Sequence, residues 1–268
     1  VRLEKFKKAI HSVVRSSDDV VDIGAGLGVL SAYVGARTSG RVCSIEYFSD
    51  VSSMALQLFR GQPRHTVKNA RSYDVQLDRD PDVVVSETIG AVGPEESIVE
   101  LLYDFKRRHP GVRDVVPQKL SLFAQAVRSD CVESHYESLL SKILGARCDE
   151  FRVDALREQL EEEYCRQVHQ FDLSGSTLAG HKIGVVAYKL GVDEFSDFTK
   201  CMKFNCDGDW NAVSLHFEAE LAEGVTLRNS IEENLTHWMH SFIKRPAGRS
   251  ELHFAYDSEL CKFTADWR

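Results

Sequence analysis

Two glutamates, Glu87 and Glu96, flank a glycine-containing loop that follows the short apolar run 83–85. If that run is a strand of a parallel sheet, the loop lies at its carboxyl end, where ligands of such sheets bind. Two carboxylates on either side of a loop can grip a planar cation such as guanidinium, which forms paired hydrogen bonds with carboxylates. A solvated acidic loop without a ligand is the alternative, because acidic side chains are mostly exposed.

A glycine-rich turn forms a second constellation. It carries an acid and then three glycines at alternate positions: Asp22, Gly24, Gly26 and Gly28. The apolar run 20–23 leads into it and a helical pattern over 29–34 follows, so the glycines allow a tight turn between a strand and a helix. Glu46 ends the next apolar run, 42–45. In a doubly wound sheet that position faces the ribose hydroxyls of a ligand.

The spacing of the glycines indicates the kind of ligand. Dinucleotide sites use G-x-G-x-x-G, because the pyrophosphate lies on a helix N-terminus. Here the pattern is G-x-G-x-G after an acid, which is typical of S-adenosylmethionine sites, where no phosphate is bound. A nicotinamide cofactor is a weaker alternative, and a strand-to-helix turn without a ligand is the third.

The elements that position these residues follow from the hydrophobic pattern. Strand and helix patterns alternate to about residue 116, which predicts a parallel sheet with helices on both faces. After Pro117 the pattern has a period of two, as in antiparallel strands, over 120–127, 184–190, 199–205 and 212–221. We therefore expect an α/β domain over residues 1–116, and an antiparallel β-sandwich or β-barrel over residues 117–268.

A charged helical stretch over about residues 136–170 interrupts these strands. Within it, Leu156, Leu160 and Tyr164 repeat at a spacing of four residues, which forms an apolar stripe on a helix. Such a helix either packs on its own domain or belongs to a protruding arm that docks on another subunit, since an apolar stripe needs to be buried.

Charge and hydropathy exclude some function classes. A net charge of −8 over 268 residues argues against a general nucleic-acid binder and suits a basic partner or substrate. No apolar stretch is long enough to span a membrane. The chain begins with Val1 rather than Met, so we expect it to be part of a longer protein.

The seven cysteines include no C-x-x-C pair, which predicts reduced thiols in a cytoplasmic or nuclear protein. The closest two, Cys201 and Cys206, have no other ligand near them in the sequence that would complete a zinc site. We therefore expect no metal.

Taken together, the motifs resemble the class I protein arginine methyltransferases. The resemblance covers nearly the whole chain in the family's order, through Asp22–Leu30, Glu46, Ser86-Glu87, Glu96-Ser97 and Thr236-His237-Trp238. The family's double-glutamate loop reads S-E-W-M-G-Y and then E-S-M. This chain reads S-E-T-I-G-A and then E-S-I, with the same spacing between the glutamates.

The resemblance implies a Rossmann-like domain that binds S-adenosyl-L-methionine, followed by an antiparallel β-barrel with an inserted helical dimerisation arm. It implies that Glu87 and Glu96 hold the substrate guanidinium and that His237 supports the site from the barrel. It also implies that Arg2 binds the methionine carboxylate of the cofactor, beside the turn glycines and Glu46. A cis peptide at Val116-Pro117 is expected between the domains.

The double-glutamate loop departs from the family at several positions. Thr88 and Ile89 stand where the family has Trp and Met, Ala91 replaces an aromatic residue, and Gly93-Pro94 replaces bulky residues. These departures favour a regulatory subunit, or prozyme, of the kind found in trypanosomatids, which forms a hetero-oligomer with an active paralogue. An active enzyme that forms homodimers and methylates arginine-rich proteins is the alternative. A third hypothesis, a small-molecule or RNA methyltransferase, is supported by the glycine turn alone.

Overall fold

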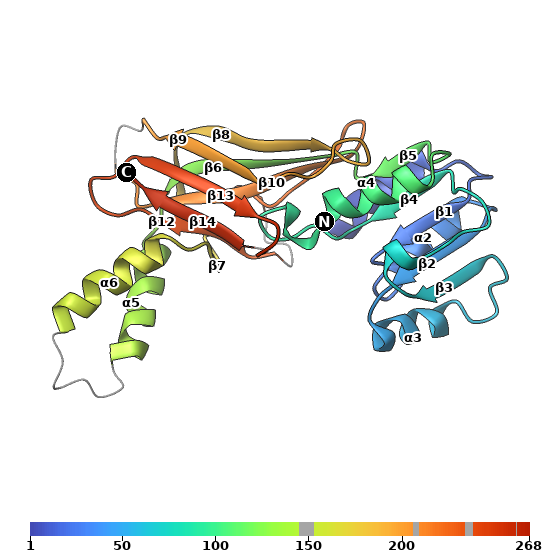
Figure 1. Ribbon diagram of the computed structural model, residues 1–268, viewed down its shortest axis with the longest axis horizontal. Coiled ribbons are helices and arrows are strands. Elements are labelled where there is room, and N and C mark those ends of the chain that lie inside the picture. Colours follow the sequence, from blue (N-terminus) through green and yellow to red (C-terminus); the bar gives the residue numbers. More distant parts are fainter. Residues whose placement is uncertain (145–152, 206–208, 234–237, 261) are drawn as a thin grey trace. The chain divides into compact units, whose positions relative to one another are not determined.

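The computed structural model describes residues 1–144, 153–205, 209–233, 238–260 and 262–268. The predicted parallel sheet has the strand order β3-β2-β1-β4-β5. Its strands are β1 (Val20–Ile23), β2 (Val42–Glu46), β3 (His65–Asn69), β4 (Val83–Ser86) and β5 (Asp114–Val116), as Figure 1 shows. Every residue of β1, β2 and β4 is buried, because these strands are covered on both faces, and this is why they appear in the sequence as continuous apolar runs.

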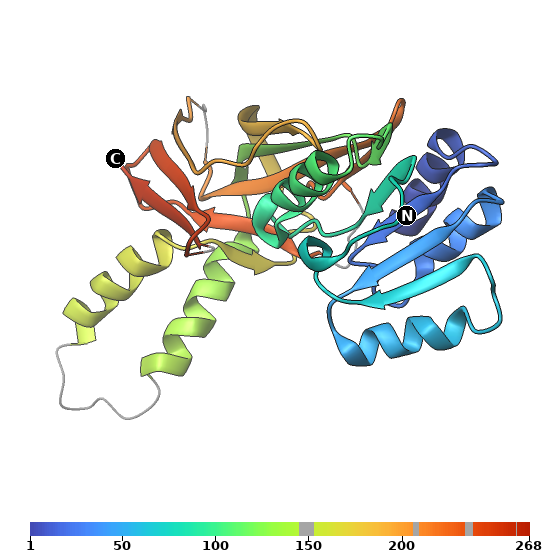
Figure 2. The same cartoon turned by 45° about the vertical axis from the view of Figure 1, so that its right-hand side comes forward.

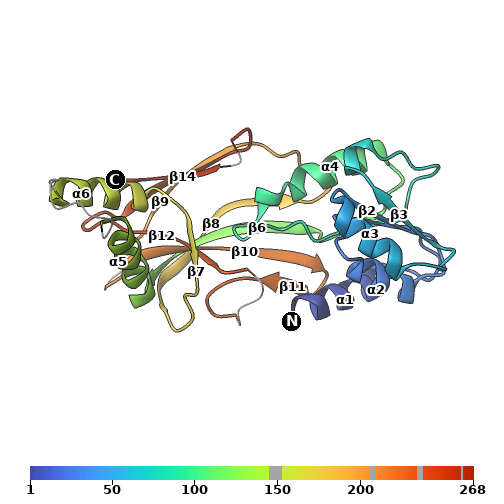
Figure 3. The same cartoon turned by 90° about the horizontal axis from the view of Figure 1, so that it is seen from below.

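Helices cover both faces of this sheet. They are α1 (Arg2–Val13), α2 (Val29–Arg37), α3 (Ser49–Leu58) and α4 (Ile98–Arg108), with the 3₁₀ turns η1 (Ser72–Asp74) and η2 (Pro94–Glu96). Figure 3 shows α4 on one side of the strands and α1 and α2 on the other. The apolar stripe of α1 buries Phe6, Ala9 and Ile10. Crossovers on both faces create the reversal of strand order beside β1 at which ligands of such sheets bind.

The later part of the chain is antiparallel, as predicted. One sheet has the order β7-β12-β10-β6-β8, with β11 beside β10. Its strands are β6 (Lys119–Arg128), β7 (His169–Phe171), β8 (Thr177–Lys189), β10 (Ala212–Ala222), β11 (Val225–Arg228) and β12 (His240–Lys244). A second sheet has the order β14-β13-β9, built from β9 (Phe198–Lys203), β13 (Glu251–Asp257) and β14 (Lys262–Trp267).

The chain forms two compact units. The first comprises Val1–Ser121, Ala187–Phe195 and Glu218–Leu227, and the second comprises Leu122–Val186, Ser196–Phe217 and Arg228–Arg268. The division predicted between residues 116 and 117 stays a prediction, since the units are not continuous stretches of chain. The peptide bond Val116-Pro117 is cis, as expected. No helix among the described residues is long and apolar enough to cross a membrane.

The predicted helical stretch forms α5 (Asp130–Leu144) and α6 (Val153–Cys165), which extend away from the strands of the second unit in Figure 2. Their bases pack on that unit: Tyr164 is 4% exposed and belongs to a core cluster with Tyr136 and Phe242. The prediction that Tyr164 belongs to a docking face is therefore wrong. Leu160 packs against the same cluster. Among the residues of the two helices whose side chains the structure describes, the large apolar ones that are exposed are Leu139 and Ile143 of α5.

A buried ammonium joins the two helices at their base. Lys244 of β12 is 5% exposed. Its Nζ donates to Glu161 of α6 at 2.7 Å and lies 3.7 Å from Glu133 of α5. These contacts connect both helices to the sheet of the second unit.

Candidate active site

The glycine turn connects β1 to α2 through backbone conformations that suit glycine. The φ angles of Gly24, Gly26 and Gly28 are +67°, +56° and +85°. A Cβ at Gly24 would meet the Thr88 methyl group at 2.6 Å, and one at Gly28 would meet the Phe59 ring at the same distance. The turn is therefore fixed both by its backbone and by what packs against it.

Glu46 closes this turn from the end of β2. Its Oε2 accepts a hydrogen bond from the Gly26 N–H at 2.9 Å, and its Oε1 accepts one from the Phe48 N–H at 2.9 Å. The side chain is 7% exposed and lines a cavity at the carboxyl end of the strands. Each carboxylate oxygen has a second lone pair, so Glu46 can still accept hydroxyl donors from a ligand.

Asp22 lies behind the turn and not in the cavity. It is 1% exposed, and its Oδ2 accepts from the Ser31 hydroxyl at 2.7 Å, which in turn lies 2.6 Å from the Ser44 hydroxyl. Its Oδ1 has no hydrogen-bond partner among the described residues. Burial raises the pKa of Asp22 to about 7, and the nearby charges of Glu87 and Glu46 act in the same direction. The predicted contact of Asp22 with the cofactor stays a prediction.

The cavity in front of the turn has a volume of about 490 Å³, within the usual range for small-molecule sites. It contains both predicted glutamates of the loop, together with Glu46 and Gly24. The lining residues are Ile23, Gly24, Ile45, Glu46, Tyr47, Phe48, Ala70, Arg71, Ser72, Tyr73, Glu87, Thr88, Glu96 and Leu101. All of them belong to the first unit.

Glu87 and Glu96 line this cavity, and the guanidinium of Arg2 lies beside Glu87. Arg2 Nη1 donates to Glu87 Oε1 at 2.9 Å. Burial raises the pKa of Glu87 to about 7; Arg2 opposes this shift and Glu96 adds to it. Burial likewise raises the pKa of Glu96, and the positive charge of Arg2 acts in the opposite direction. The pair can therefore hold a cation, and near neutral pH Glu87 can also carry a proton.

The loop between the two glutamates is held by its own contacts. Glu95 Oε1 accepts from the Val92 N–H at 2.6 Å. Ile89 is 1% exposed and Thr88 lines the cavity. Ser97, directly after Glu96, has a φ of +62°, which is rare for a residue with a side chain. The loop thus has a definite shape, but small or inward-facing side chains stand where the resemblance places aromatic and sulfur-containing ones.

Comparison with known proteins agrees with this arrangement. No protein-family model matches the chain. A stretch of 103 residues is 29% identical to probable protein arginine N-methyltransferase 6 of Arabidopsis thaliana, over 37% of this chain and 23% of that protein. A stretch of 85 residues is 33% identical to probable histone-arginine methyltransferase 1.4 of the same plant, over 30% of this chain and 16% of that protein. The chain thus spans about a quarter or less of these relatives.

Solved structures match over the whole chain. The PRMT1 enzyme–prozyme heterotetramer of Trypanosoma brucei with AdoHcy has a TM-score of 0.74 at 15% identity, over 95% of this chain and 83% of that chain. Protein arginine methyltransferase 10 of Arabidopsis thaliana has a TM-score of 0.74 at 13% identity, over 100% of this chain and 93% of that chain. The chain thus shares its fold with solved protein arginine methyltransferases, and short stretches of its sequence are similar to proteins of that kind. The fold predicted from the sequence is thereby confirmed.

One residue predicted for this family's site lies outside the described part of the chain. His237 and its neighbour Thr236 are not among the described residues. Trp238, the third residue of that motif, is buried in the second unit, where it meets the Phe217 ring edge to face at 5.0 Å. The proposed support of the glutamates by His237 stays a prediction.

Two aromatic rings at the edge of the cavity were not predicted from the sequence. Tyr47 and Phe48 directly follow Glu46 and are 53% and 66% exposed, and the Arg71 guanidinium lies 4.9 Å from the Tyr47 ring centre. Exposed rings beside a cavity are suited to stack on a flat ligand ring. They directly follow Glu46, the acid that ends β2, and this position in the sequence could have predicted them.

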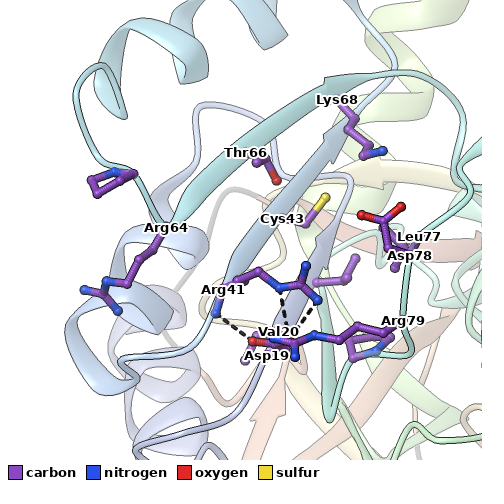
Figure 4. A pocket seen from close by; sticks show the side chains of 13 residues that line it. Asp19, Val20, Arg41, Cys43, Arg64, Thr66, Lys68, Leu77, Asp78 and Arg79 are labelled. Atoms are coloured by element: carbon purple, nitrogen blue, oxygen red, sulfur yellow. Dashed lines mark hydrogen bonds and ion pairs between the residues drawn. The ribbon is translucent and has the colours of Figure 1, made fainter.

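A second pocket lies against the first halves of β1, β2 and β3 (Figure 4). Its volume is about 240 Å³. Basic side chains surround it, but Asp19 pairs with Arg41 at 3.1 Å and with Arg79 at 2.5 Å, and Arg64 donates to the Thr38 carbonyl at 2.6 Å. Because ligands of such sheets bind at the other end of the strands, we place the candidate site at the 490 Å³ cavity.

Proposed function

We propose that this chain is a protein arginine methyltransferase subunit that binds S-adenosyl-L-methionine but is impaired in catalysis, and that it assembles with an active paralogue as its regulatory partner. One observation carries the proposal. Glu87 and Glu96 line one cavity, but the loop between them provides Thr88 in place of an aromatic wall, and Ile89 is buried. The cavity therefore keeps the carboxylates that bind a guanidinium but lacks the aromatic side chains that would position it.

The residues present fit the cofactor. Glu46 has free lone pairs for ribose hydroxyls at the end of β2, and Gly24 lines the same cavity. Arg2 supplies a cation suited to the methionine carboxylate, and Tyr47 and Phe48 supply faces suited to adenine. The similar PRMT1 complex of Trypanosoma brucei was solved with AdoHcy, and a similar PRMT6 structure with SAH.

The family reaction shows what the altered loop would weaken. Bound S-adenosyl-L-methionine would supply a methyl group to a guanidinium nitrogen held by Glu87 and Glu96, and one of these carboxylates would take up the proton that the nitrogen loses. Guanidinium is a poor nucleophile because its charge is delocalised, so the reaction depends on carboxylates and on alignment. Glu87 and Glu96 retain the carboxylates. Without aromatic walls the alignment and the exclusion of water are reduced, so the rate falls.

One assay distinguishes methylation by this chain from an effect of this chain on the activity of a partner enzyme. The full chain, alone and co-expressed with an active arginine methyltransferase from the same genome, is assayed on an arginine-glycine-rich peptide. The chain alone should show almost no methylation, and its presence should raise the partner's activity. A Glu87→Gln, Glu96→Gln double variant should support the partner as well as the wild type does.

The second candidate, an active enzyme, is favoured by the presence of both glutamates in one cavity. It predicts the opposite result. Methylation by the chain alone, lost in the double variant, would replace the regulatory proposal with this one.

We propose that α5 and α6 carry the assembly. Leu139 and Ile143 are 38% and 42% exposed and stand one helical turn apart on α5. Exposed apolar side chains on an extended helical pair suit burial against another subunit, either an identical chain or a paralogue. The similar Trypanosoma brucei structure is an enzyme–prozyme heterotetramer, which fits a hetero-oligomer.

Ile143→Glu and Leu139→Glu should each weaken association at least ~10-fold, because a carboxylate buried without a partner costs more than the 1.4 kcal/mol that a tenfold change requires. Sedimentation over a dilution series measures this effect, with Thr199→Glu, on an exposed strand position, as the charge-matched control. If both α5 variants associate as tightly as the control, the assembly proposal is wrong.

A cytoplasmic or nuclear location remains a proposal. The described free thiols are Cys43, Cys131, Cys165 and Cys201. Unpaired thiols suit a reducing compartment.

A further inference from the structure

Strands β9 and β13 bring three metal-ligating side chains together. Cys201 of β9 lies directly opposite His253 of β13 in the antiparallel register, and Lys203 lies opposite Glu251. Burial alternates along β13, with Leu252, Phe254 and Tyr256 buried. Glu251 and His253 are two residues apart, so they share the other face of the strand. Figure 1 shows β9 and β13 side by side.

The ligand atoms form a small triangle. Cys201 Sγ lies 3.4 Å from Glu251 Oε1 and 3.6 Å from His253 Nε2, and these last two atoms are 2.9 Å apart. Tetrahedral zinc has bonds of about 2.0–2.3 Å, which place nitrogen and oxygen ligands about 3.4 Å apart and sulfur about 3.6 Å from either. Two edges of the triangle already match these values, and the third needs to open by about half an ångström.

We propose that Cys201, Glu251 and His253 form a zinc site with an open fourth position for water or an exogenous ligand. A set of one sulfur, one imidazole nitrogen and one carboxylate oxygen suits Zn²⁺ rather than Mg²⁺ or Ca²⁺, which prefer oxygen ligands. The expectation of no metal came from ligands close in sequence, whereas these ligands are separated by about fifty positions. None of them lines the cavity that contains Glu87.

The surroundings support an ordered ligand set. Lys203 Nζ lies 3.1 Å from Glu251 Oε2 and holds the carboxylate so that its other oxygen, Oε1, faces Cys201 and His253. Contacts of this kind orient metal ligands in known sites. His253 and Glu251 are 24% and 23% exposed and Cys201 is exposed, so an ion can enter from solvent.

The test uses the full chain after treatment with a chelator. Zn²⁺ is titrated in competition with a chromogenic chelator, and Co²⁺ is added separately to detect the absorption of a cobalt–thiolate bond. We expect one tight Zn²⁺ per chain and a cobalt–thiolate band.

Cys201→Ser and His253→Ala should each lower Zn²⁺ affinity at least ~10-fold, because loss of even an outer-shell partner lowers metal affinity 10–100-fold. Cys201→Ser should also abolish the cobalt–thiolate band. Cys131→Ser and His181→Ala serve as matched controls that should bind as the wild type does.

Protection of the thiol gives a second readout that does not depend on a variant. Zn²⁺ should slow the alkylation of Cys201 in the wild-type chain, followed by mass spectrometry of its peptide, and should not change the alkylation of Cys131. Absence of a tight site in the wild type, or equal binding by the Cys201 and His253 variants and their controls, would overturn the proposal. So would alkylation of Cys201 at the same rate with and without Zn²⁺.

Discussion

Replacing Asp22 with asparagine should flatten the dependence of stability on pH. Burial raises the pKa of Asp22 from 3.8 to about 7 in the folded chain. The stability that this group contributes is present in full below pH ~4 and is lost as the pH rises to about 7, since the unfolded carboxyl ionises first. A shift of ~3 units at 1.36 kcal/mol each is on the order of 4 kcal/mol. The variant lacks this loss because asparagine does not ionise.

The measurement is urea unfolding of both proteins between pH 3 and pH 8. Below pH ~4 the two free energies of unfolding should agree closely, because asparagine has nearly the shape of a protonated aspartate and can still accept from Ser31. Above pH 7 the variant should be the more stable. Glu87 also has a raised pKa, so the difference between the proteins, and not either curve alone, isolates Asp22. Ser44→Ala removes a hydroxyl from the same network and should keep the wild-type slope. A variant whose slope equals that of the wild type contradicts the raised pKa of the buried Asp22 carboxyl in β1.

Replacing Glu46 with glutamine should weaken S-adenosyl-L-methionine binding ~10–100-fold. Hydrogen bonds from ligand hydroxyls to a charged acceptor contribute about 1.5–3 kcal/mol, and glutamine offers one oxygen in place of two. The substitution keeps an acceptor for Gly26 or Phe48 but not for both, so the unliganded chain should lose only about 1–3 kcal/mol of stability.

The control for this variant is Arg79→Ala, which alters the separate pocket of Figure 4. It should bind the cofactor as the wild type does. If the Glu46 variant binds with wild-type affinity, the ribose does not lie at the end of β2.

The parallel sheet and its ligand edge could be predicted because their determinants are local. Strands β1 and β4 are buried along their whole length, so they appear in the sequence as apolar runs, and three glycines with positive φ mark the turn between β1 and α2. The expected strand 212–221 corresponds to β10, at Ala212–Ala222, and was predicted from its period of two.

The apolar face of the helical pair could not be predicted in the same way. A spacing of four shows that Leu156, Leu160 and Tyr164 share a face, but not which surface that face meets. In the structure Tyr164 belongs to the core, its hydroxyl lies 2.6 Å from His135 Nδ1, and the exposed apolar side chains are Leu139 and Ile143. Only tertiary packing decides between the two arrangements.

The proposed metal ligands illustrate a second limit. Cys201 and His253 are direct neighbours across two strands, but their separation in sequence is set by everything between β9 and β13. Register between distant strands depends on the whole sheet, so no spacing rule connects these positions. The same holds for Arg2 and Glu87, which pair at 2.9 Å although 85 positions separate them.

Calorimetric titration of the wild-type chain with S-adenosyl-L-methionine tests the central claim most directly. We predict one binding site per chain, with the affinity reduced in Glu46→Gln and unchanged in Arg79→Ala. Heat of binding that is absent in the wild type, or that is the same in all three proteins, would contradict the assignment of the cavity at the carboxyl ends of β1, β2 and β4 to this cofactor.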